Sequence, residues 1–473
     1  MERRPIQLLA GVWNIGENEE VLVSVASQVR KESLGASVTS RGRPLIRLAL
    51  VETSEAKRSN IQSRTSSQLL DQGIELKIID YETTCSAVGT VLEAEAQATL
   101  QSGLEGIGTA REVCTIVAAA SMDLTDDPII WFLDDDLHFI QLGLNADGSL
   151  RFDNQQNLFQ EAWSFHERHP SVVASFGGVT GCPPLPASST MLSNMIDFGS
   201  SLTGERDVVH DVSRWDIPDH YYDLSENPDR QEVIFPPCMW NDGTDILDAI
   251  FCHGTLFRPV VLTDIANSAA EQRRIVRGGN SLIYDLRAFF RNPYPTLELN
   301  GIRSRRGDSV WACLSQFIDG GETLSHNMRL HHGRNSIGWD ANQASQFTDR
   351  MLADLYGAAF HRAIESSHER GEFISVNSLL DLAQDIRLKL NERAERQVEI
   401  LRSSASLASE MVSADPSYAE LREEVESICE VALSVLQELP GEDELHAALV
   451  DCWSRTTMWR DEIAPRLMEL AGC

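Results

Sequence analysis

The chain has 473 residues, of which 42% are hydrophobic, enough to form a sizeable core and more than one domain. Its 71 acidic residues outnumber its 40 basic residues, which gives a formal net charge of -31. This charge disfavours nucleic acid or an anionic membrane surface as the main partner.

The cysteines and the N-terminus indicate the cellular compartment. The nine cysteines are scattered and form no Cys-x-x-Cys pair, which argues against a disulfide framework or a zinc site. The N-terminus has an apolar run too short and broken for a signal peptide, and no segment has the roughly 18 uncharged apolar residues of a membrane helix. We therefore predict a cytoplasmic protein with no integral membrane segment.

The first 140 residues alternate between short apolar runs and amphipathic stretches. This is the β-α-β pattern of an α/β fold, with a mostly parallel sheet flanked by helices. The predicted strands are 6–12, 45–51, 74–79 and 129–133, and the predicted helices are 18–29, 60–70 and 110–122. Polar residues just past the strand ends are then the places where a ligand is expected.

The pattern continues with a predicted helix over 155–169 and a strand over 171–176. Segment 191–245 differs, because it is polar, aromatic and rich in turn-forming residues. Irregular segments of this length in a compact domain are usually functional or disordered. We expect a lid or an acceptor-binding insertion there.

From residue 343 to the end, strand signals vanish and apolar residues recur at intervals of three and four. This spacing predicts an α-helical C-terminal region. The expected organisation is a catalytic domain over 1–342 followed by a helical domain over 343–473. The helices carry no readable functional motif, and we expect them to contact the acceptor, an oligomeric copy or another protein.

Three consecutive aspartates, Asp134, Asp135 and Asp136, follow the apolar strand 129–133. Side chains alternate along an extended chain, so Asp134 and Asp136 are expected on one face and Asp135 on the other. Two carboxylates about 4 Å apart repel by about 4 kcal/mol at an effective dielectric constant of 20, and a bound cation removes this repulsion. Oxygen ligands suit Mg²⁺ or Mn²⁺, so the run predicts a divalent metal site. A solvated acidic turn is the competing interpretation.

A buried strand that ends in Asp-x-Asp, fourth in a β-α-β series and preceded by an Arg-bearing helix, resembles the nucleotide-sugar glycosyltransferases of the glycosyltransferase-A fold, particularly the inverting family 2 group. In that group the motif holds the metal and the nucleotide diphosphate. The resemblance covers roughly residues 5–340 and implies a glycosyltransferase-A-like catalytic domain.

The resemblance implies further donor-binding residues beside Asp134 and Asp135. Glu52 ends the second strand, where the family commonly has an acidic residue that contacts the base or ribose. The segment 108–111 (GTAR) resembles the family's Gly-x-x-x-Ala-Arg-Asn segment, with Glu112 in place of the Asn. Arg111 and its helix N-terminus are therefore expected to meet phosphate or base. Glu52 and Arg111 as plain surface residues are the alternative.

Two more segments resemble the family's acceptor side. The run CHGTLFR over 252–258 resembles the Gly-Gly-x-x-x-x-Arg segment beside the acceptor, with His253 in place of the first glycine and Gly254 retained. Asp308 matches the acidic motif whose carboxylate deprotonates the acceptor hydroxyl, although Gly307 stands where a partner acid is usual. A helix cap is the alternative role of Asp308.

A basic cluster of Arg303, Arg305 and Arg306 precedes Asp308 in an otherwise acidic chain. Arg305 and Arg306 are expected to grip the diphosphate or an anionic acceptor, because the guanidinium group matches the geometry of phosphate and carboxylate. A surface ion-pair group is the alternative.

A short predicted strand ends in His331 and His332. In many metal-dependent members of the family, a histidine after the last strand of the domain is the third protein ligand. Alternation along the strand allows only one of the two to face the metal. Resemblance to galactofuranosyltransferase-like members favours His331, so the expected ligands are Asp134 and Asp136 with His331 (or His332).

These expectations combine into a metal-dependent, hexosyltransferase-type glycosyltransferase. It would use Mn²⁺ or Mg²⁺ to transfer a sugar from a nucleoside-diphosphate sugar to a hydroxyl acceptor, with inversion. A non-catalytic glycosyltransferase-like scaffold or binding protein stays open, as does a nucleotidyltransferase of similar topology, although the acidic, glycine-poor segment 11–20 counts against the latter. A phosphatase of the Asp-x-Asp-x-Thr type is disfavoured, because Leu137-His138 stands where x-Thr is needed.

Overall fold

The structure is a computed structural model, and it describes part of the chain. The described residues are 6–12, 46–52, 75–79, 81–91, 107–121, 129–133, 137–145, 150–154, 158–177, 179–181, 186–202, 232–234, 246–251, 260–262, 281–326, 328–332, 343–372 and 374–471. The predicted helices 18–29 and 60–70 lie outside them. Among the described helices, none combines the length and apolar character that a membrane crossing needs.

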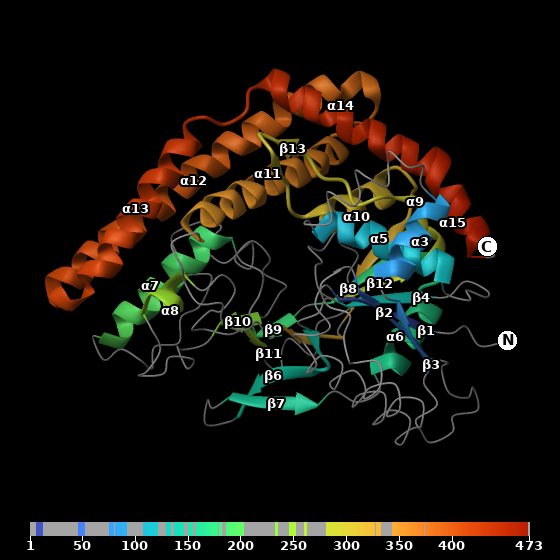
Figure 1. Ribbon diagram of the computed structural model, residues 1–473, viewed down its shortest axis with the longest axis horizontal. Helices are drawn as coiled ribbons and strands as arrows, with labels where there is room; N and C mark the ends of the chain where they lie inside the picture. Colours follow the sequence, from blue (N-terminus) through green and yellow to red (C-terminus); the bar gives the residue numbers. More distant parts are fainter. Residues whose placement is uncertain are drawn as a thin grey trace.

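Two sheets form the α/β part of the molecule (Figure 1). Sheet A has the strand order β15-β8-β12-β4-β1-β2-β3. Its strands are β1 (Ile6–Val12), β2 (Ile46–Glu52), β3 (Glu75–Ile79), β4 (Ile129–Leu133), β8 (Val172–Gly177), β12 (Ser281–Asp285) and β15 (Glu322–Ser325).

Sheet A is mixed, with four parallel and two antiparallel strand pairs, so the expected parallel sheet is found only in part. The pairs β15·β8, β4·β1, β1·β2 and β2·β3 are parallel. Strand β12 is antiparallel to both of its neighbours, β4 and β8. The antiparallel strand lies 148 residues after β4 in the sequence, counted from Leu133 to Ser281, so the local β-α-β pattern could not reveal it.

Sheet B is smaller and also mixed, with the order β5-β16-β9-β11-β6-β7 and with β10 paired to β11. Its strands are β5 (Leu137–His138), β6 (Ile140–Leu144), β7 (Leu150–Asn154), β9 (Val179–Gly181), β10 (Glu232–Ile234), β11 (Val260–Leu262) and β16 (Leu330–His332). A hairpin of β13 (Glu298–Leu299) and β14 (Ile302–Arg303) stands apart from both sheets.

Helices cover sheet A unequally. One face carries α3 (Tyr81–Val91), α5 (Ile107–Ser121), α9 (Leu286–Arg291), α10 (Gly307–Phe317) and the C-terminal α15 (Ala464–Leu470), while α6 (Leu158–Arg168) lies on the other side (Figure 1). Residues of α3, α5, α9, α15 and the strands β4 and β12 form one buried apolar cluster. The chain end therefore packs back onto the α/β part.

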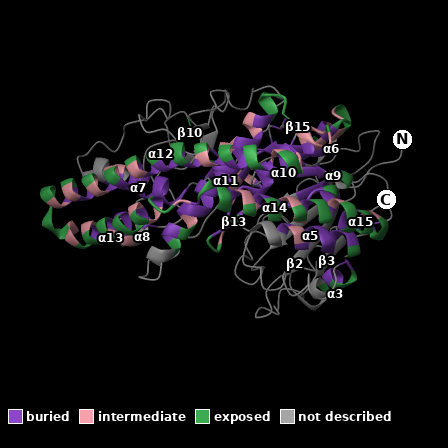
Figure 2. Ribbon diagram, turned by 90° about the horizontal axis from the view of Figure 1, so that it is seen from above, coloured by how far each residue is buried: buried purple, intermediate pink, exposed green. Residues whose placement is uncertain are grey.

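The C-terminal helices arch over the molecule (Figure 1). They are α11 (Gln343–Glu369), η3 (Val376–Ser378), α12 (Leu379–Ala414), η4 (Pro416–Tyr418), α13 (Ala419–Leu436), α14 (Glu442–Met458) and the π-helical turn η5 (Trp459–Ile463) before α15. Buried and exposed residues alternate in bands along α12 and α13, as Figure 2 shows, which is the expected pattern of amphipathic helices. The described part from residue 343 onward is helical, as predicted from its spacing.

Segment 191–245 is only partly described, and its start differs from the expectation. Residues 191–202 belong to α7 (Ala187–Leu202), and α8 (Ile246–Phe251) follows the segment. The Thr190 and Ser193 hydroxyls donate hydrogen bonds to the carbonyls four residues earlier, those of Pro186 just before α7 and of Ser189 within it. The expectation of an irregular segment is therefore wrong for 191–202.

Helix α10 lies between two apolar cores. Val310, Cys313 and Leu314 belong to the cluster formed with the C-terminal helices, whereas Trp311 and Ala312 belong to the cluster on sheet A. Every residue from Gly307 to Ser315 is buried. The two halves of the molecule therefore share α10, and the predicted domain boundary at 342/343 stays a prediction.

Gly357 of α11 permits a close approach to the segment that precedes α10. A Cβ atom at position 357 would lie 2.1 Å from the carbonyl oxygen of Arg305, and the Arg305 N–H donates to the Ala353 carbonyl at 2.9 Å. We expect Gly357→Ala to reduce the free energy of unfolding by about 1–3 kcal/mol through overpacking. Chemical denaturation measures this change.

Gly441→Ala is the matched control, because its added Cβ atom would meet only Glu444 Oε2, at 3.9 Å. We expect a loss below about 1 kcal/mol for this variant. Equal losses for the two variants would contradict the close packing of α11 on Arg305.

Candidate functional site

The carboxyl edge of sheet A contains a topological switch point. From β1, the chain places β2 and β3 on one side and then returns to place β4 on the other. Ligands in open α/β sheets bind outside the carboxyl ends of the strands, at the point where the strand order reverses. The residues that follow β4 are therefore the first place to look for a site.

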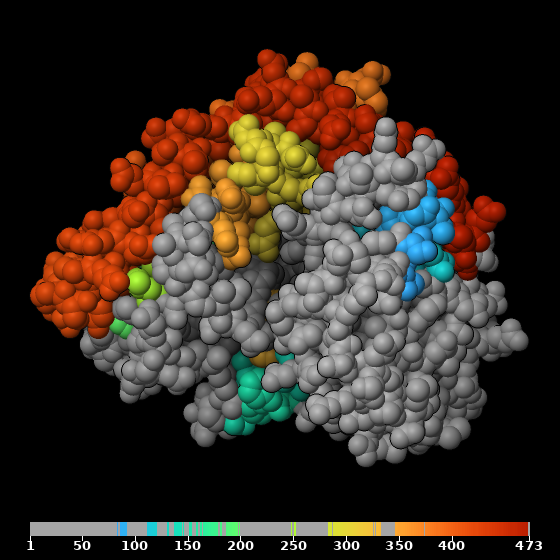
Figure 3. Space-filling model, viewed as in Figure 1, coloured from blue at the N-terminus to red at the C-terminus, as the bar shows by residue number. Residues whose placement is uncertain are grey.

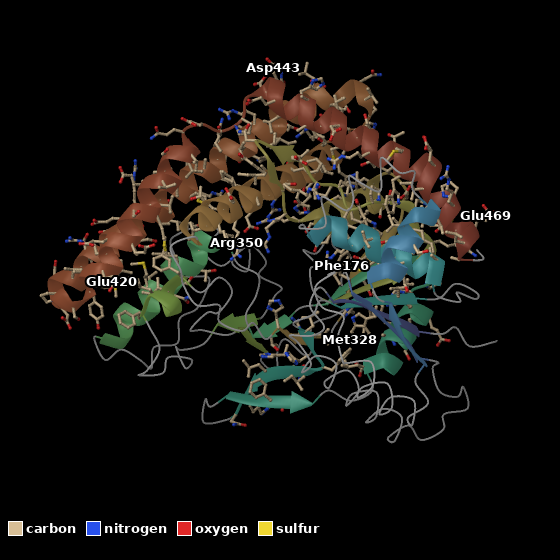
Figure 4. All side chains as sticks on the ribbon, viewed as in Figure 1. Phe176, Met328, Arg350, Glu420, Asp443 and Glu469 are labelled. Carbon is tan, nitrogen blue, oxygen red and sulfur yellow. The ribbon has the colours of Figure 1, made fainter. Side chains whose placement is uncertain are left out.

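The chain crosses from sheet A to sheet B at this edge three times. Strand β4 leads into β5, β8 into β9, and β15 into β16. The last two crossings run side by side, since β15 is parallel to β8 and β16 is parallel to β9. Phe176, at the end of β8, and Met328, before β16, lie at this junction (Figure 4).

The junction is tightly packed. The His326 N–H donates to the Phe176 carbonyl at 2.9 Å, and a Cβ atom on Gly177 would lie 2.2 Å from the Met328 carbonyl oxygen. The teal surface of the β6–β7 region and the yellow surface near residue 300 appear on one face of the molecule (Figure 3). The contacts at the junction hold the two sheets together.

The acidic run Asp134–Asp136 occupies the β4–β5 crossing and lies outside the described residues. Its flanks are described and are buried on both sides: Ile130 and Trp131 are 0% exposed, and Leu137 and Phe139 are 1% exposed. Trp131 and Phe139 also contact each other edge to face, with ring centroids 5.6 Å apart. The described residues on both sides of the run are therefore anchored by apolar contacts.

The pairing of β5 with β16 sets the two predicted histidines beside the strand that follows the acidic run. His332 lies opposite Leu137, the residue that follows Asp136, and His331 lies opposite His138. His331 and Leu137 are separated by almost 200 positions in the sequence, yet antiparallel pairing sets β16 beside β5, the strand that begins directly after the acidic run. The joining of the acidic run and one histidine in a single site, which the resemblance implies, stays a prediction because the run lies outside the described residues.

His331 and His332 point to opposite faces of sheet B, as alternation requires. His332 is 1% exposed, whereas His331 is partly exposed. The His331 ring lies 5.3 Å from the Phe152 ring and 6.2 Å from the His138 ring, centroid to centroid. Its Nδ1 atom is 3.5 Å from Thr180 Oγ1. His331 is thus the one of the pair that a ligand can reach.

Position 181, beside His331, has room and backbone geometry for glycine only. It has a φ of +88°, and a Cβ atom there would lie 2.6 Å from His331 Cε1. Burial, together with the neighbouring His138 and His332, lowers the pKa of His331 to about 4. The imidazole is therefore neutral near pH 7, the form that binds metal ions. Among the described residues there is no group of three His, Cys, Asp or Glu side chains able to hold a metal.

Arg111 and Asp308, which the sequence assigned to the donor and to the acceptor side, meet in the structure. Arg111 Nη1 lies 3.7 Å from Asp308 Oδ2, and both residues are buried, 5% and 8% exposed. The Arg111 guanidinium also lies over the Tyr294 ring, 5.5 Å from its centroid, in a cation–π contact. Asp308 is in the first turn of α10, where a carboxylate is favoured by the helix dipole.

Glu112, next to Arg111, faces the segment that carries Tyr294. The Tyr294 N–H donates to Glu112 Oε1 at 3.2 Å. Burial raises the pKa of Glu112 to about 7, against the opposing positive charges of Arg455 and Arg303 and this hydrogen bond. The sequence singled out Glu112 only as a departure from the family's asparagine, and the structure gives it a contact of its own.

The basic cluster before α10 is tied to its surroundings. Arg305 Nη1 lies 3.2 Å from Asp354 Oδ2 of α11, and Arg303 Nη2 lies 3.8 Å from Glu298 Oε2. Arg306 is buried and has a φ of 68°, a conformation that residues other than glycine seldom adopt. These contacts match the ion-pair alternative for Arg305, while the binding of diphosphate or acceptor by Arg305 and Arg306 stays a prediction.

The remaining predicted site residues cannot be placed by their side chains. Asp134, Asp135, Asp136, His253 and Gly254 lie outside the described residues, and Glu52 is described only as the last residue of β2. Glu52 nevertheless ends a parallel strand at the same edge of sheet A as β4.

Sequence reasoning missed His138, Tyr284 and Tyr294. His138 was considered only as the replacement of a phosphatase threonine, although it lies two positions after the acidic run. Tyr294 and Tyr284 are joined by a hydrogen bond between their hydroxyl groups at 2.9 Å. No local motif marks these tyrosines, because their role depends on contacts with α5 and α10.

Neither a protein-family model nor a curated protein matches this chain. Among solved structures, the chain is similar to S. aureus TarS residues 1–349 in complex with UDP, with a TM-score of 0.32, 11% sequence identity and 92% coverage of each chain. A second structure of TarS 1–349 gives a TM-score of 0.29 at the same identity and coverage. Both TM-scores are too low to carry a conclusion about fold or function.

The raised pKa of Glu112 predicts a pH dependence of stability. Between the ordinary value of 4.5 and about 7, the folded chain keeps a proton on Glu112 that the unfolded chain has lost. The stability contributed by this group is full below pH 4.5 and falls as the pH rises to 7. Glu112→Gln removes this titration, so the variant does not lose that stability as the pH rises. The free energy of unfolding of the variant minus that of the wild type should therefore increase by about 2–3 kcal/mol between pH 5 and pH 8.

Chemical denaturation of the wild type and Glu112→Gln at several pH values measures this gain. The difference between the two proteins should grow up to about pH 7 and then level off. Parallel pH profiles would contradict the burial of an uncharged Glu112.

Proposed function

We propose that this protein is a metal-dependent glycosyltransferase. It transfers a sugar from a nucleoside-diphosphate sugar to a hydroxyl acceptor, with inversion at the anomeric carbon, on a glycosyltransferase-A-like scaffold. The observation that carries the proposal is the β5–β16 pairing, in which His331 and His332 lie in the strand next to the one that follows Asp136. The acidic run also follows the strand at the switch point of sheet A.

Asp134, Asp136 and His331 would hold Mn²⁺ or Mg²⁺. The described residues fit this role, because His331 is partly exposed, has a neutral imidazole near pH 7 and lies opposite His138, two positions after Asp136. Carboxylate and imidazole together suit Mn²⁺ in particular. Such an ion, when bound, stabilises the negative charge that develops on the departing diphosphate. Asp135 and Glu52 are the candidates for contact with the nucleoside.

Asp308 is the proposed general base. Helix α10 leads into β15, and α5 leads into β4, so both helices start near the carboxyl edge of sheet A. The Asp308 carboxylate is buried in the first turn of α10 and would accept the proton of the acceptor hydroxyl as that oxygen attacks the sugar. Direct attack on the side opposite the departing diphosphate inverts the anomeric carbon. His253, Gly254, Arg305 and Arg306 are the proposed acceptor side.

The metal-dependent site predicts nucleotide binding that requires a cation. Nucleoside diphosphates with Mn²⁺ at saturating concentration should raise the melting temperature by about 2–5 °C, and the same nucleotides with a chelator should not. Thermal unfolding of the wild type with a panel of nucleoside diphosphates measures the shift.

Asp136→Ala and His331→Ala should abolish the cation-dependent part of this shift, while His332→Ala should retain it because His332 faces away from His331. A shift that survives Asp136→Ala would exclude the proposed ligand set. No cation-dependent shift for any nucleotide would favour the scaffold alternative.

The base assignment predicts a selective loss of turnover in Asp308→Asn. The amide keeps the shape of the side chain but accepts no proton, so kcat for sugar transfer should fall by about 10²–10⁴-fold with little change in the donor KM. Steady-state kinetics with a panel of nucleotide sugars measures both. A kcat within tenfold of the wild type would exclude Asp308 as the base.

A further inference from the structure

A buried tyrosine connects Arg111 to the C-terminal helices. Tyr294 lies in segment 292–297, between α9 and β13, and is 2% exposed. Its ring carries the Arg111 guanidinium, 5.5 Å from the ring centroid, and Arg111 in turn lies 3.7 Å from the Asp308 carboxylate. The Tyr294 hydroxyl donates to the Tyr284 hydroxyl at 2.9 Å, which anchors the far end of the Tyr294 side chain.

Both the backbone and the flanks of segment 292–297 are held by other elements. The Tyr294 N–H donates to Glu112 Oε1 at 3.2 Å. From the C-terminal helices, Arg455 Nη2 donates to the Thr296 carbonyl at 3.2 Å, and Trp459 Nε1 donates to the Phe290 carbonyl at 2.9 Å. The segment is therefore fixed from α5 on one side and from α14 and η5 on the other.

The geometry of the Arg111–Asp308 pair makes the position of Asp308 depend on how segment 292–297 is held. A separation of 3.7 Å exceeds the length of an N–H···O hydrogen bond, so Arg111 attracts the Asp308 carboxylate through its charge rather than through a short hydrogen bond. The position of the Asp308 carboxylate then depends on where the guanidinium is held. The cation–π attraction between a guanidinium and an aromatic ring is stronger when both groups are buried, because water does not weaken it.

We propose that Tyr294 is a positioning residue for sugar transfer: its ring fixes Arg111, and through Arg111 it sets the Asp308 carboxylate against the acceptor hydroxyl. The inference rests on the proposed role of Asp308 as the base. It also gives the C-terminal helices a function, because α14 and η5 hold the segment from which Tyr294 reaches Arg111. A misplacement of about 1 Å at a reacting group can slow a reaction by about 10²-fold.

Three variants test this role by steady-state kinetics, at a temperature where each is folded. Tyr294→Leu removes the ring and should lower kcat by about 10- to 100-fold, with the donor KM within about threefold of the wild type. Tyr294→Phe keeps the ring under Arg111 and should retain kcat within about threefold. Tyr356→Leu is the matched control, since Tyr356 of α11 is also 2% exposed, and it should leave kcat within about threefold.

The conservative variant separates positioning from stability. If Tyr294→Phe loses as much kcat as Tyr294→Leu, or if Tyr294→Leu keeps the wild-type kcat, the proposal is overturned. A loss in Tyr356→Leu equal to that in Tyr294→Leu would overturn it as well, because general destabilisation would then explain the effect.

A double-mutant cycle decides the case in which the wild type transfers no sugar from any donor, which would overturn the proposed function. The wild type, Tyr294→Leu, Asp308→Asn and the double variant are compared by their unfolding equilibrium constants, once with Arg111 intact and once with Arg111→Met. With Arg111 intact, the effect of the double variant should differ by at least about threefold from the product of the two single effects, and with Arg111→Met this difference should disappear. That result supports the chain from Tyr294 through Arg111 to Asp308. Additive effects with Arg111 intact would overturn that chain, whatever the activity.

Discussion

The hydrogen bonds that join β5 to β16 link parts of the chain that no local pattern connects. They pair Leu137 and His138, just after the acidic run, with His332 and His331. The parallel pairs β15·β8 and β16·β9 continue the same junction across both sheets. A shift of one residue in the β5–β16 register would turn His331 to the other face of sheet B, because side chains alternate along a strand. The candidate metal site therefore depends on this register.

Helix α10 provides the second connection, between the sheet and the C-terminal helices. Adjacent residues of this helix enter different cores, Val310 toward α11–α14 and Trp311 toward sheet A. A helix buried on both sides cannot shift without opening one core, so its first turn is a rigid support for Asp308. The arginines near Asp308 have close partners. Arg111 pairs with Asp308 and lies over the Tyr294 ring, and Arg305 pairs with Asp354. The C-terminal region is thus structurally continuous with the candidate site.

The sequence predicted the strands with continuous apolar runs well. Strands β1 and β4 have the predicted bounds, and β2 is displaced by one residue. It singled out the histidines His331 and His332, which lie in the strand beside the one that follows the acidic run, but their role stays a prediction. It also singled out Arg111 and Asp308, but it did not predict that these two form a pair. Resemblance gave an order along the chain, whereas the pairing depends on how α5 and α10 pack on sheet A.

The missed features have physical reasons. The strands of sheet B have two to five residues, too few to show an alternating pattern, and β12 enters sheet A antiparallel from far along the chain. Helix α7 is rich in serine and threonine, which compete with helix formation until burial against α12 favours it. Helix α3 was missed, as its sequence YETTCSAVGTV has β-branched residues and a glycine, which weaken the helical signal. No sequence motif marks Tyr294, because the role proposed for it depends on contacts with residues far away in the sequence.

The central claim is that the acidic run and His331 form one metal site. Electron spin-echo spectroscopy of bound Mn²⁺, with a nucleoside diphosphate present, measures this directly through the magnetic coupling of the ion to an imidazole nitrogen. The account predicts that the nitrogen coupling is present in the wild type and in His332→Ala and absent in His331→Ala. Bound Mn²⁺ without nitrogen coupling in the wild type, or with coupling that persists in His331→Ala, would contradict it.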